Sequence, residues 1–140
     1  MKTIILYGST TGNTESLAES LASALDDKFE VLIKDVSKAN VDELNNFDLI
    51  LFGSSTWGSG ELQDDFYDFY NNLDDIDLSG KKAGAFGVGD SAFPEFCRSV
   101  EVLEDKLKDL GAEIIIESFK WDGDVTSEAE ESIQSWAEGL

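Results

Sequence analysis

Apolar runs alternate along the whole chain with stretches of mixed apolar and polar residues. Five runs predict β-strands: TIILY (3–7), FEVLIK (29–34), FDLILFG (47–53), KAGAFGVG (82–89) and AEIIIESFK (112–120). The first, third and fourth runs contain almost only apolar or small residues. This pattern is typical of parallel strands that are buried on both faces of a sheet.

Between these runs, apolar residues recur every three or four positions, which is the spacing of an amphipathic helix. Three helices are predicted from the sets Leu17, Leu21, Leu25; Leu62, Phe66, Phe69, Tyr70, Leu73; and Val100, Leu103, Leu107, Leu110. Gly111 is expected to end the third of them. Two more helices are expected over 124–138 and within 35–46, with these residues facing inward: Ile133, Trp136, Ala137, Val41 and Leu44.

The alternation of strands and helices predicts an α/β fold, a doubly wound parallel sheet with helices on both faces. We expect one domain over residues 1–140, because no linker, repeat or low-complexity segment interrupts the pattern. Ligands of such folds bind outside the carboxyl ends of the strands. Three segments with unusual chemistry follow predicted strands, at 8–14, 53–61 and 87–97. They are expected to converge at one edge of the sheet.

The charge balance narrows the possible partners. The chain has 10 Lys and Arg against 30 Asp and Glu, a formal charge of −20. Nucleic acid and anionic membranes should repel it, and proteins with basic patches should attract it. One cysteine and no histidine exclude an internal disulfide, multi-cysteine or histidine-ligated metal sites and histidine catalysis. With no signal peptide or apolar run of membrane length, the sequence favours a cytoplasmic protein. Its small size and high like charge favour a monomer.

The first segment, YGSTTGNT (7–14), combines glycines with hydroxyl and amide side chains and contains no lysine or arginine. Gly8 and Gly12 allow tight turns, and the helix that follows presents free N–H groups to an anion. The segment therefore resembles a phosphate site built from dipoles alone. It matches neither the P-loop nor the dinucleotide-binding motif. The alternative is an ordinary capped start of a helix.

The second and third segments carry aromatic rings among small residues. Trp57, beside Gly58 in SSTWGSGEL (54–62), offers a stacking surface for a planar ligand, or it folds back onto the core. Phe93 in VGDSAFPEFC (88–97) offers a second surface or packs inward. Phe96 reads most simply as a core residue, and Cys97 as a small buried one, since no histidine is present to activate its thiol.

Together these three segments, and WDGD at 121–124, resemble the flavodoxins, specifically the short-chain ones. The resemblance covers the whole chain and implies the flavodoxin-like three-layer fold with strand order 2-1-3-4-5. It implies non-covalent FMN and transfer of single electrons between redox proteins through the semiquinone/hydroquinone couple, at low potential. It implies no enzymatic activity. The fifth strand, 112–120, should be continuous, without the roughly 20-residue interruption of long-chain flavodoxins.

The resemblance also implies which residues hold FMN. The phosphate would contact Ser9, Thr10, Thr11, Gly12, Asn13 and Thr14. The ribityl and phosphate side would be approached by Ser54, Ser55 and Thr56. Trp57 would stack on the inner flavin face and Phe93 on the outer face, and the Gly58 carbonyl would turn toward flavin N5 on reduction. The remaining contacts are expected from Gly87, Gly89, Asp90, Glu95, Phe96 and Cys97.

The missing lysine has an electrostatic consequence. A phosphate bound by dipoles keeps its charge, and one charge about 10 Å from the flavin opposes an added electron by about 1.7 kcal/mol at a dielectric near 20. Acids expected near the ring are Glu61, Asp64, Asp65, Asp90, Glu95, Glu101, Asp122 and Asp124. We expect their summed field to make the second reduction difficult, although each acid alone reads more simply as a solvated surface charge.

Other functions fit the same architecture. A phosphate-accepting receiver needs paired acids after the first strand, where this chain has Tyr7 and Gly8. A tyrosine phosphatase needs a C-x₅-R loop, which is absent. Two alternatives bind FMN as well: a flavoprotein with its own substrate and an activator of ribonucleotide reductase.

Overall fold

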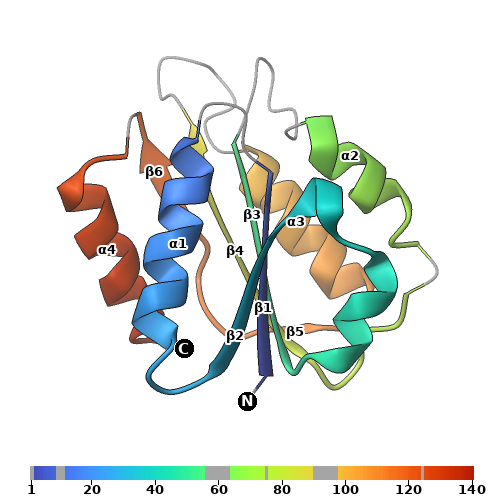
Figure 1. The fold of residues 1–140 in the computed structure, drawn as a ribbon. Helices are drawn as coiled ribbons and strands as arrows, with labels where there is room; N and C mark the ends of the chain where they lie inside the picture. Colours follow the sequence, from blue (N-terminus) through green and yellow to red (C-terminus); the bar gives the residue numbers. More distant parts are fainter. Residues whose placement is uncertain (1, 9–11, 56–63, 75, 90–97, 124) are drawn as a thin grey trace.

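The structure is a computed structural model that describes residues 2–8, 12–55, 64–74, 76–89, 98–123 and 125–140. Its centre is a parallel sheet with helices on both faces (Figure 1). The strands are β1 (Lys2–Gly8), β2 (Glu30–Asp35), β3 (Leu49–Ser55), β4 (Lys82–Gly89), β5 (Glu113–Ile114) and β6 (Phe119–Asp122). Their order is β2-β1-β3-β4-β5, with β6 also paired to β4, which confirms the predicted fold class and strand order.

The register of the central strands brings their carboxyl ends together. Gly8 of β1 lies opposite Ser54 of β3, and Ser54 lies opposite Gly87 of β4. The three segments singled out in the sequence therefore follow strand ends at one edge of the sheet, as the α/β topology requires.

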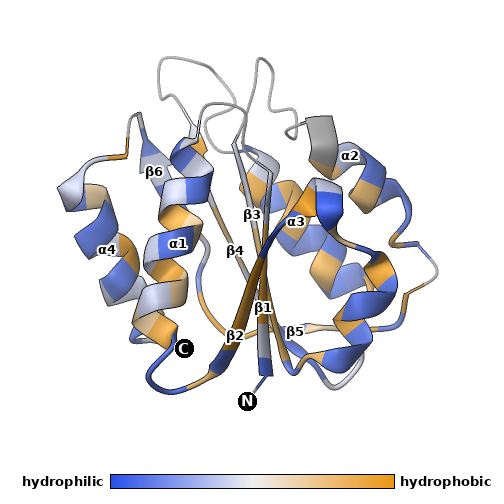
Figure 2. Ribbon diagram, viewed as in Figure 1, coloured by the Kyte–Doolittle hydropathy of each residue, from blue (hydrophilic) through white to orange (hydrophobic). Residues whose placement is uncertain are grey.

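The helices form two layers. α1 (Asn13–Leu25) and α4 (Ser127–Ala137) cover one face, while α2 (Asp64–Asn71) and α3 (Arg98–Asp109) cover the other (Figure 1). Each layer has its own apolar core, because successive residues of a buried strand point to opposite faces. Ile4 and Leu6 belong to the core under α2 and α3, and Ile5 to the core under α1 and α4. In Figure 2 the strands are largely hydrophobic and the helices carry their hydrophilic residues outward.

The helical predictions are confirmed where the structure describes them. The apolar positions of α1 and α3 are buried, and Gly111, at a φ of 99°, follows the end of α3. The segment 35–46 forms two short 3₁₀ helices, η1 (Val36–Lys38) and η2 (Val41–Asn46). Leu44 is fully buried and Val41 is partly buried, as expected. Leu62 lies outside the described residues.

The prediction of one continuous strand over 112–120 is wrong. β5 and β6 both pair with β4, but residues 115–118 between them are not in strand conformation. Gly84 and Ala85 are the residues of β4 that face this gap, so the outer chain carries two extra residues there. The carbonyl of Glu117 turns away from the ladder and accepts a 2.7 Å hydrogen bond from Trp136 Nε1. The interruption is therefore a bulge of the outer chain.

No helix among the described residues is long and apolar enough to cross a membrane.

Candidate functional site

The candidate site lies at the carboxyl ends of β1, β3 and β4. Gly8, Ser55 and Gly89 are the last residues of these strands, and the segments 9–11, 56–63 and 90–97 follow them in the sequence. Many of the predicted FMN contacts lie outside the described residues: Ser9, Thr10, Thr11, Thr56, Trp57, Gly58, Asp90, Phe93, Glu95, Phe96 and Cys97. Their roles remain predictions.

The first turn of α1 is open to a ligand. The residue before it, Gly12, has a φ of 90°, and as a glycine it has no side chain with which to cap the helix. The first helical hydrogen bond runs from the Ser16 N–H to the Gly12 carbonyl, over 3.0 Å. The N–H groups of the preceding residues therefore have no partner within the helix, and the positive end of its dipole points outward. This arrangement suits an anion.

Two buried hydroxyl groups at this edge have no hydrogen-bond partner among the residues that the structure describes. Thr14 lies in the first turn of α1 and is fully buried, and its Oγ1 is unpartnered. Ser55 Oγ, at the end of β3, is buried and unpartnered too. Leaving such a group unsatisfied costs about 1–3 kcal/mol. A phosphate and a polyol would satisfy both groups, so the residues present fit FMN.

A third unpartnered hydroxyl lies elsewhere. Thr3 Oγ1 is also fully buried, but Thr3 is the second residue of β1, at the opposite end of the strand from the site. An unpartnered hydroxyl is thus not by itself the sign of a ligand. At Thr14 it coincides with an uncapped helix start, and at Thr3 it does not.

Three of the predicted FMN contacts, Ser54, Gly87 and Asn13, have a role in holding the fold together at this edge. The Ser54 hydroxyl is fully buried and donates to the Ser55 carbonyl over 2.9 Å. A Cβ at Gly87 would lie 2.3 Å from the Ser54 carbonyl oxygen and 2.5 Å from Val100 Cγ2. Asn13 Oδ1 accepts a 3.4 Å hydrogen bond from the Val125 N–H, which ties the start of α1 to the segment after β6.

The end of β6 joins the same edge, as the resemblance of WDGD to the flavodoxins suggested. Asp122 lies opposite Gly89 in the register, and the Gly123 N–H donates to the Gly89 carbonyl over 2.8 Å. Gly123 adopts a φ of 87°, which favours glycine. Four strand ends, rather than three, therefore shape the site.

Carboxylates surround the end of β1. The pKa of Tyr7 is raised, first by burial and then by the negative charges of Glu15, Asp35 and Glu19. Glu15 lies in the first turn of α1, where no basic residue occurs. A phosphate bound here would keep its charge uncompensated by these side chains, as the electrostatic hypothesis requires.

Glu101 departs from that hypothesis. Its carboxylate accepts hydrogen bonds from Arg98 Nη1 at 2.9 Å and Lys120 Nζ at 2.8 Å. The Lys120 and Arg98 hydrogen bonds lower the pKa of Glu101. Two cations therefore balance this acid, and it adds little to a negative field. Arg98 precedes Glu101 by three residues on α3, whereas Lys120 of β6 reaches Glu101 only in the folded chain, and neither contact was identified from the sequence.

No group of three or more possible metal ligands occurs in the part of the chain that the structure describes.

Comparisons with known proteins agree on the family. The flavodoxin family model matches residues 5–136. A flavodoxin of Maridesulfovibrio salexigens is 46% identical over 143 residues, covering 99% of this chain and 96% of that protein. The crystal structure of oxidised flavodoxin 1 from Bacillus cereus has a TM-score of 0.95 at 35% identity, covering 99% of this chain and 96% of that chain.

A flavodoxin of Fusobacterium nucleatum solved with flavin mononucleotide has a TM-score of 0.82 at 18% identity, covering 98% of this chain and 95% of that chain. At that identity the likeness shows the fold alone. The family model and the relative from Maridesulfovibrio salexigens show the family of this chain. The chain belongs to the flavodoxin family, whose members bind FMN and carry electrons between redox proteins rather than act as enzymes.

Proposed function

We propose that this chain is a low-potential carrier of single electrons that holds FMN at the carboxyl ends of β1, β3 and β4. Bound FMN supplies the redox chemistry, since a flavin accepts and releases electrons one at a time. The observation that carries the proposal is the buried, unpartnered Thr14 hydroxyl in the first turn of an uncapped helix. The hydroxyl and the N–H groups of that turn offer donors to one anion.

The first turn of α1 binds the FMN phosphate with neutral donors. The left-handed conformation of Gly12 lets the chain enter the helix there, and Thr14 adds its hydroxyl. Because Glu15 is the only charged residue in this turn, the phosphate keeps its negative charge. That charge and the carboxylates around Tyr7 oppose the addition of electrons at the site.

The end of β3 binds the ribityl chain. Ser54 uses its hydroxyl on the neighbouring carbonyl, whereas Ser55 retains an unpartnered one for a ribityl hydroxyl. We assign the ring contacts to the segments 56–63 and 90–97, with Trp57 on the inner and Phe93 on the outer face. This assignment rests on the sequence.

The charge of −20 supports partners with basic docking patches, whose association should slow as salt rises. The same like charge favours a monomer. We place the protein in the cytoplasm, as one domain over residues 1–140.

Anaerobic reduction of the FMN-loaded protein tests the proposal. Visible spectra recorded during slow reduction should show a long-wavelength absorption band that rises and then falls, because the two electrons enter at separate potentials. Direct bleaching of the flavin, with no such band, would contradict a one-electron carrier. It would favour a flavoprotein with its own substrate.

A further inference from the structure

A groove lies between α2 and the link that holds η1 and η2. Its volume is about 430 Å³, within the usual range of ligand pockets, roughly 300–1,000 Å³. Val36, Val41 and Phe69 give it apolar walls, and Asn40, Asp68 and Asn72 bring polar groups. Figure 1 shows α2 and η1 side by side near the end of the sheet where β1 and β3 finish.

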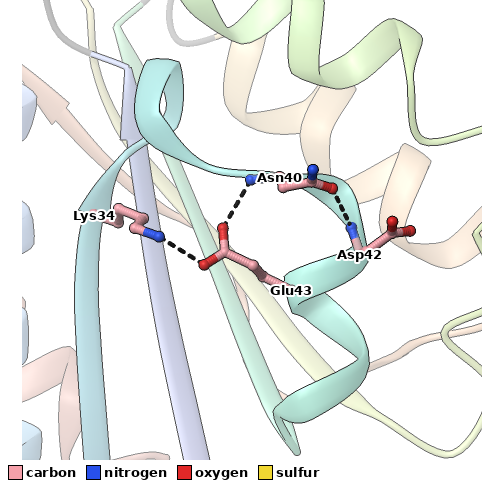
Figure 3. A network of polar contacts seen from close by, with 4 residues as sticks. All are labelled: Lys34, Asn40, Asp42 and Glu43. Atoms are coloured by element: carbon pink, nitrogen blue, oxygen red, sulfur yellow. Dashed lines mark hydrogen bonds and ion pairs between the residues drawn. The ribbon is translucent and has the colours of Figure 1, made fainter.

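One wall is held in place by a polar network (Figure 3). Glu43 Oε2 accepts the Asn40 N–H over 2.8 Å, and Glu43 Oε1 accepts Lys34 Nζ over 2.6 Å. The Asn40 side-chain oxygen accepts the Asp42 N–H over 3.0 Å. This capping box fixes the backbone and the side-chain carbonyl of Asn40 before any ligand arrives. It also neutralises Lys34, the cation of this network.

The opposite wall presents oxygen acceptors. Asp68 lies on α2 and Asn72 directly follows the last residue of that helix, and Asn72 Nδ2 donates to the Asp68 backbone carbonyl over 2.9 Å. That bond leaves the Asn72 side-chain oxygen as an acceptor. No hydrogen bond or ion pair to the Asp68 carboxylate occurs within the described part of the chain. Phe69, between them in sequence, is 4% exposed and forms part of the apolar wall.

A carboxylate and an amide oxygen beside apolar walls suit a cation at the end of an aliphatic stem. An arginine side chain fits best, because its planar guanidinium presents several donors in a fixed geometry. An anionic ligand is disfavoured by Asp68 and by the overall charge of −20.

We propose that this groove is the docking pocket for one arginine side chain of a redox partner protein. The inference rests on the proposed function and adds to it the place where the partner is anchored. α2 follows the segment 56–63, to which the sequence assigns the inner flavin contact. A partner anchored here would lie against the same end of the molecule as the cofactor.

The first test uses the FMN-loaded protein and small probes. Nα-acetyl-arginine amide is titrated while amide NMR signals are recorded, with the neutral isostere Nα-acetyl-citrulline amide as the matched control. We expect saturable shifts at Asn40 and Asn72 with the arginine probe, at least fivefold weaker in Asp68→Asn and unchanged in Asp27→Asn. Asp27 is an exposed acid at the far end of α1. Equal binding of both probes, or no effect of Asp68→Asn, would overturn the proposal.

The second test distinguishes a partner side chain from a free cation. Reduced protein is mixed at low salt with cytochrome c, a basic haem protein, and the second-order rate of electron transfer is measured. Asp68→Asn should slow the reaction at least threefold more than Asp27→Asn, although both remove one charge. Equal slowing, with the arginine probe still bound, would mean that the groove takes free cations only and would overturn partner docking.

The two proposals fail separately. Each variant is also reduced anaerobically in the absence of a partner. If the unmodified protein shows no long-wavelength band, the one-electron carrier proposal fails. If the band is present but the arginine and citrulline probes bind equally, only the docking proposal for the groove fails.

Discussion

The two ends of the sheet differ in how far their polar groups are hydrogen-bonded within the protein. At the amino end, side chains close the loops: Asp48 Oδ2 accepts the Lys2 N–H over 3.0 Å, and Lys81 Nζ donates to the Phe47 carbonyl over 2.6 Å. At the carboxyl end, the first N–H groups of α1 have no partner within the helix, and the buried hydroxyls of Thr14 and Ser55 have none in the described part of the chain. Polar groups satisfied by the protein stabilise the fold, and groups left unsatisfied at one edge indicate where a ligand completes it.

Thr3 limits this rule, since its buried hydroxyl at the amino end is also unpartnered. Thr14 differs from Thr3 in its surroundings, because Thr14 lies in the first turn of a helix, where the N–H groups have no partner within the helix.

The largest effect is expected at Gly87, which packs the carboxyl end itself. In Gly87→Ala the new Cβ would lie 2.3 Å from the Ser54 carbonyl oxygen, a backbone atom that cannot move aside cheaply. We expect the free energy of unfolding in urea to fall by about 3 kcal/mol or more. Gly12→Ala is the control, since its Cβ meets nothing within 4 Å and only its φ of 90° costs energy, about 1 kcal/mol. A larger loss in Gly12→Ala would contradict the packing described for Gly87.

The next effect concerns apoprotein stability at both ends of the sheet. Thr3→Val and Thr14→Val each replace a buried, unpartnered hydroxyl with a methyl group of similar size. Without FMN, both variants should be more stable than the unmodified protein, with a free energy of unfolding in urea about 1 kcal/mol higher. With saturating FMN, Thr3→Val should keep its advantage and Thr14→Val should lose it. If Thr14→Val also remains more stable with FMN, its hydroxyl does not meet the cofactor.

Ser55→Ala separates the two unpartnered hydroxyls at the carboxyl end. If the Ser55 hydroxyl contacts the ribityl chain, its removal should weaken the binding of FMN and of riboflavin equally. The expected loss is about fivefold, because one neutral hydrogen bond contributes about 1 kcal/mol. Fluorescence titration of both flavins measures this. Weakening confined to FMN would place Ser55 at the phosphate instead.

The smallest effect is expected at Glu43, in the network of Figure 3. The Lys34 and Asn40 hydrogen bonds lower the pKa of Glu43 below its usual value of 4.5. A lowered pKa contributes stability above that value, and the contribution is lost as the pH falls through the folded pKa. Glu43→Gln should therefore be less stable than the original protein at pH 7, and the difference should shrink below pH 4.5. Thermal unfolding at several pH values follows this, and a difference independent of pH would exclude the ionised carboxylate as its source.

Much of the fold follows from the sequence. The apolar runs and helical spacings predict a parallel sheet with helices on both faces, because burial on one or two faces leaves a direct periodic signal. The strand order comes from the resemblance to the flavodoxins. The bulge at 115–118 was not predictable, since it depends on the contact between Glu117 and Trp136. Local patterns do not encode such pairings.

The site follows less completely. The phosphate segment was identified from its composition, and the structure supports its described part through Gly12 and Thr14. The sequence did not reveal that Arg98 and Lys120 balance Glu101, nor that Asn13 holds the segment after β6. The Lys120–Glu101 and Asn13–Val125 contacts depend on residues that only the tertiary fold brings together, whereas Arg98 and Glu101 are three residues apart on one helix.

The most direct test of the central claim compares FMN with riboflavin, which lacks the phosphate, in Thr14→Val and Thr3→Val. Dissociation constants come from the quenching of flavin fluorescence on binding. Thr14→Val should bind FMN at least tenfold more weakly, the worth of a charge-assisted hydrogen bond of about 1.5–3 kcal/mol, and bind riboflavin as before. Thr3→Val should bind both flavins as before. Equal FMN binding by the two variants would contradict the claim that Thr14 and the start of α1 hold the phosphate.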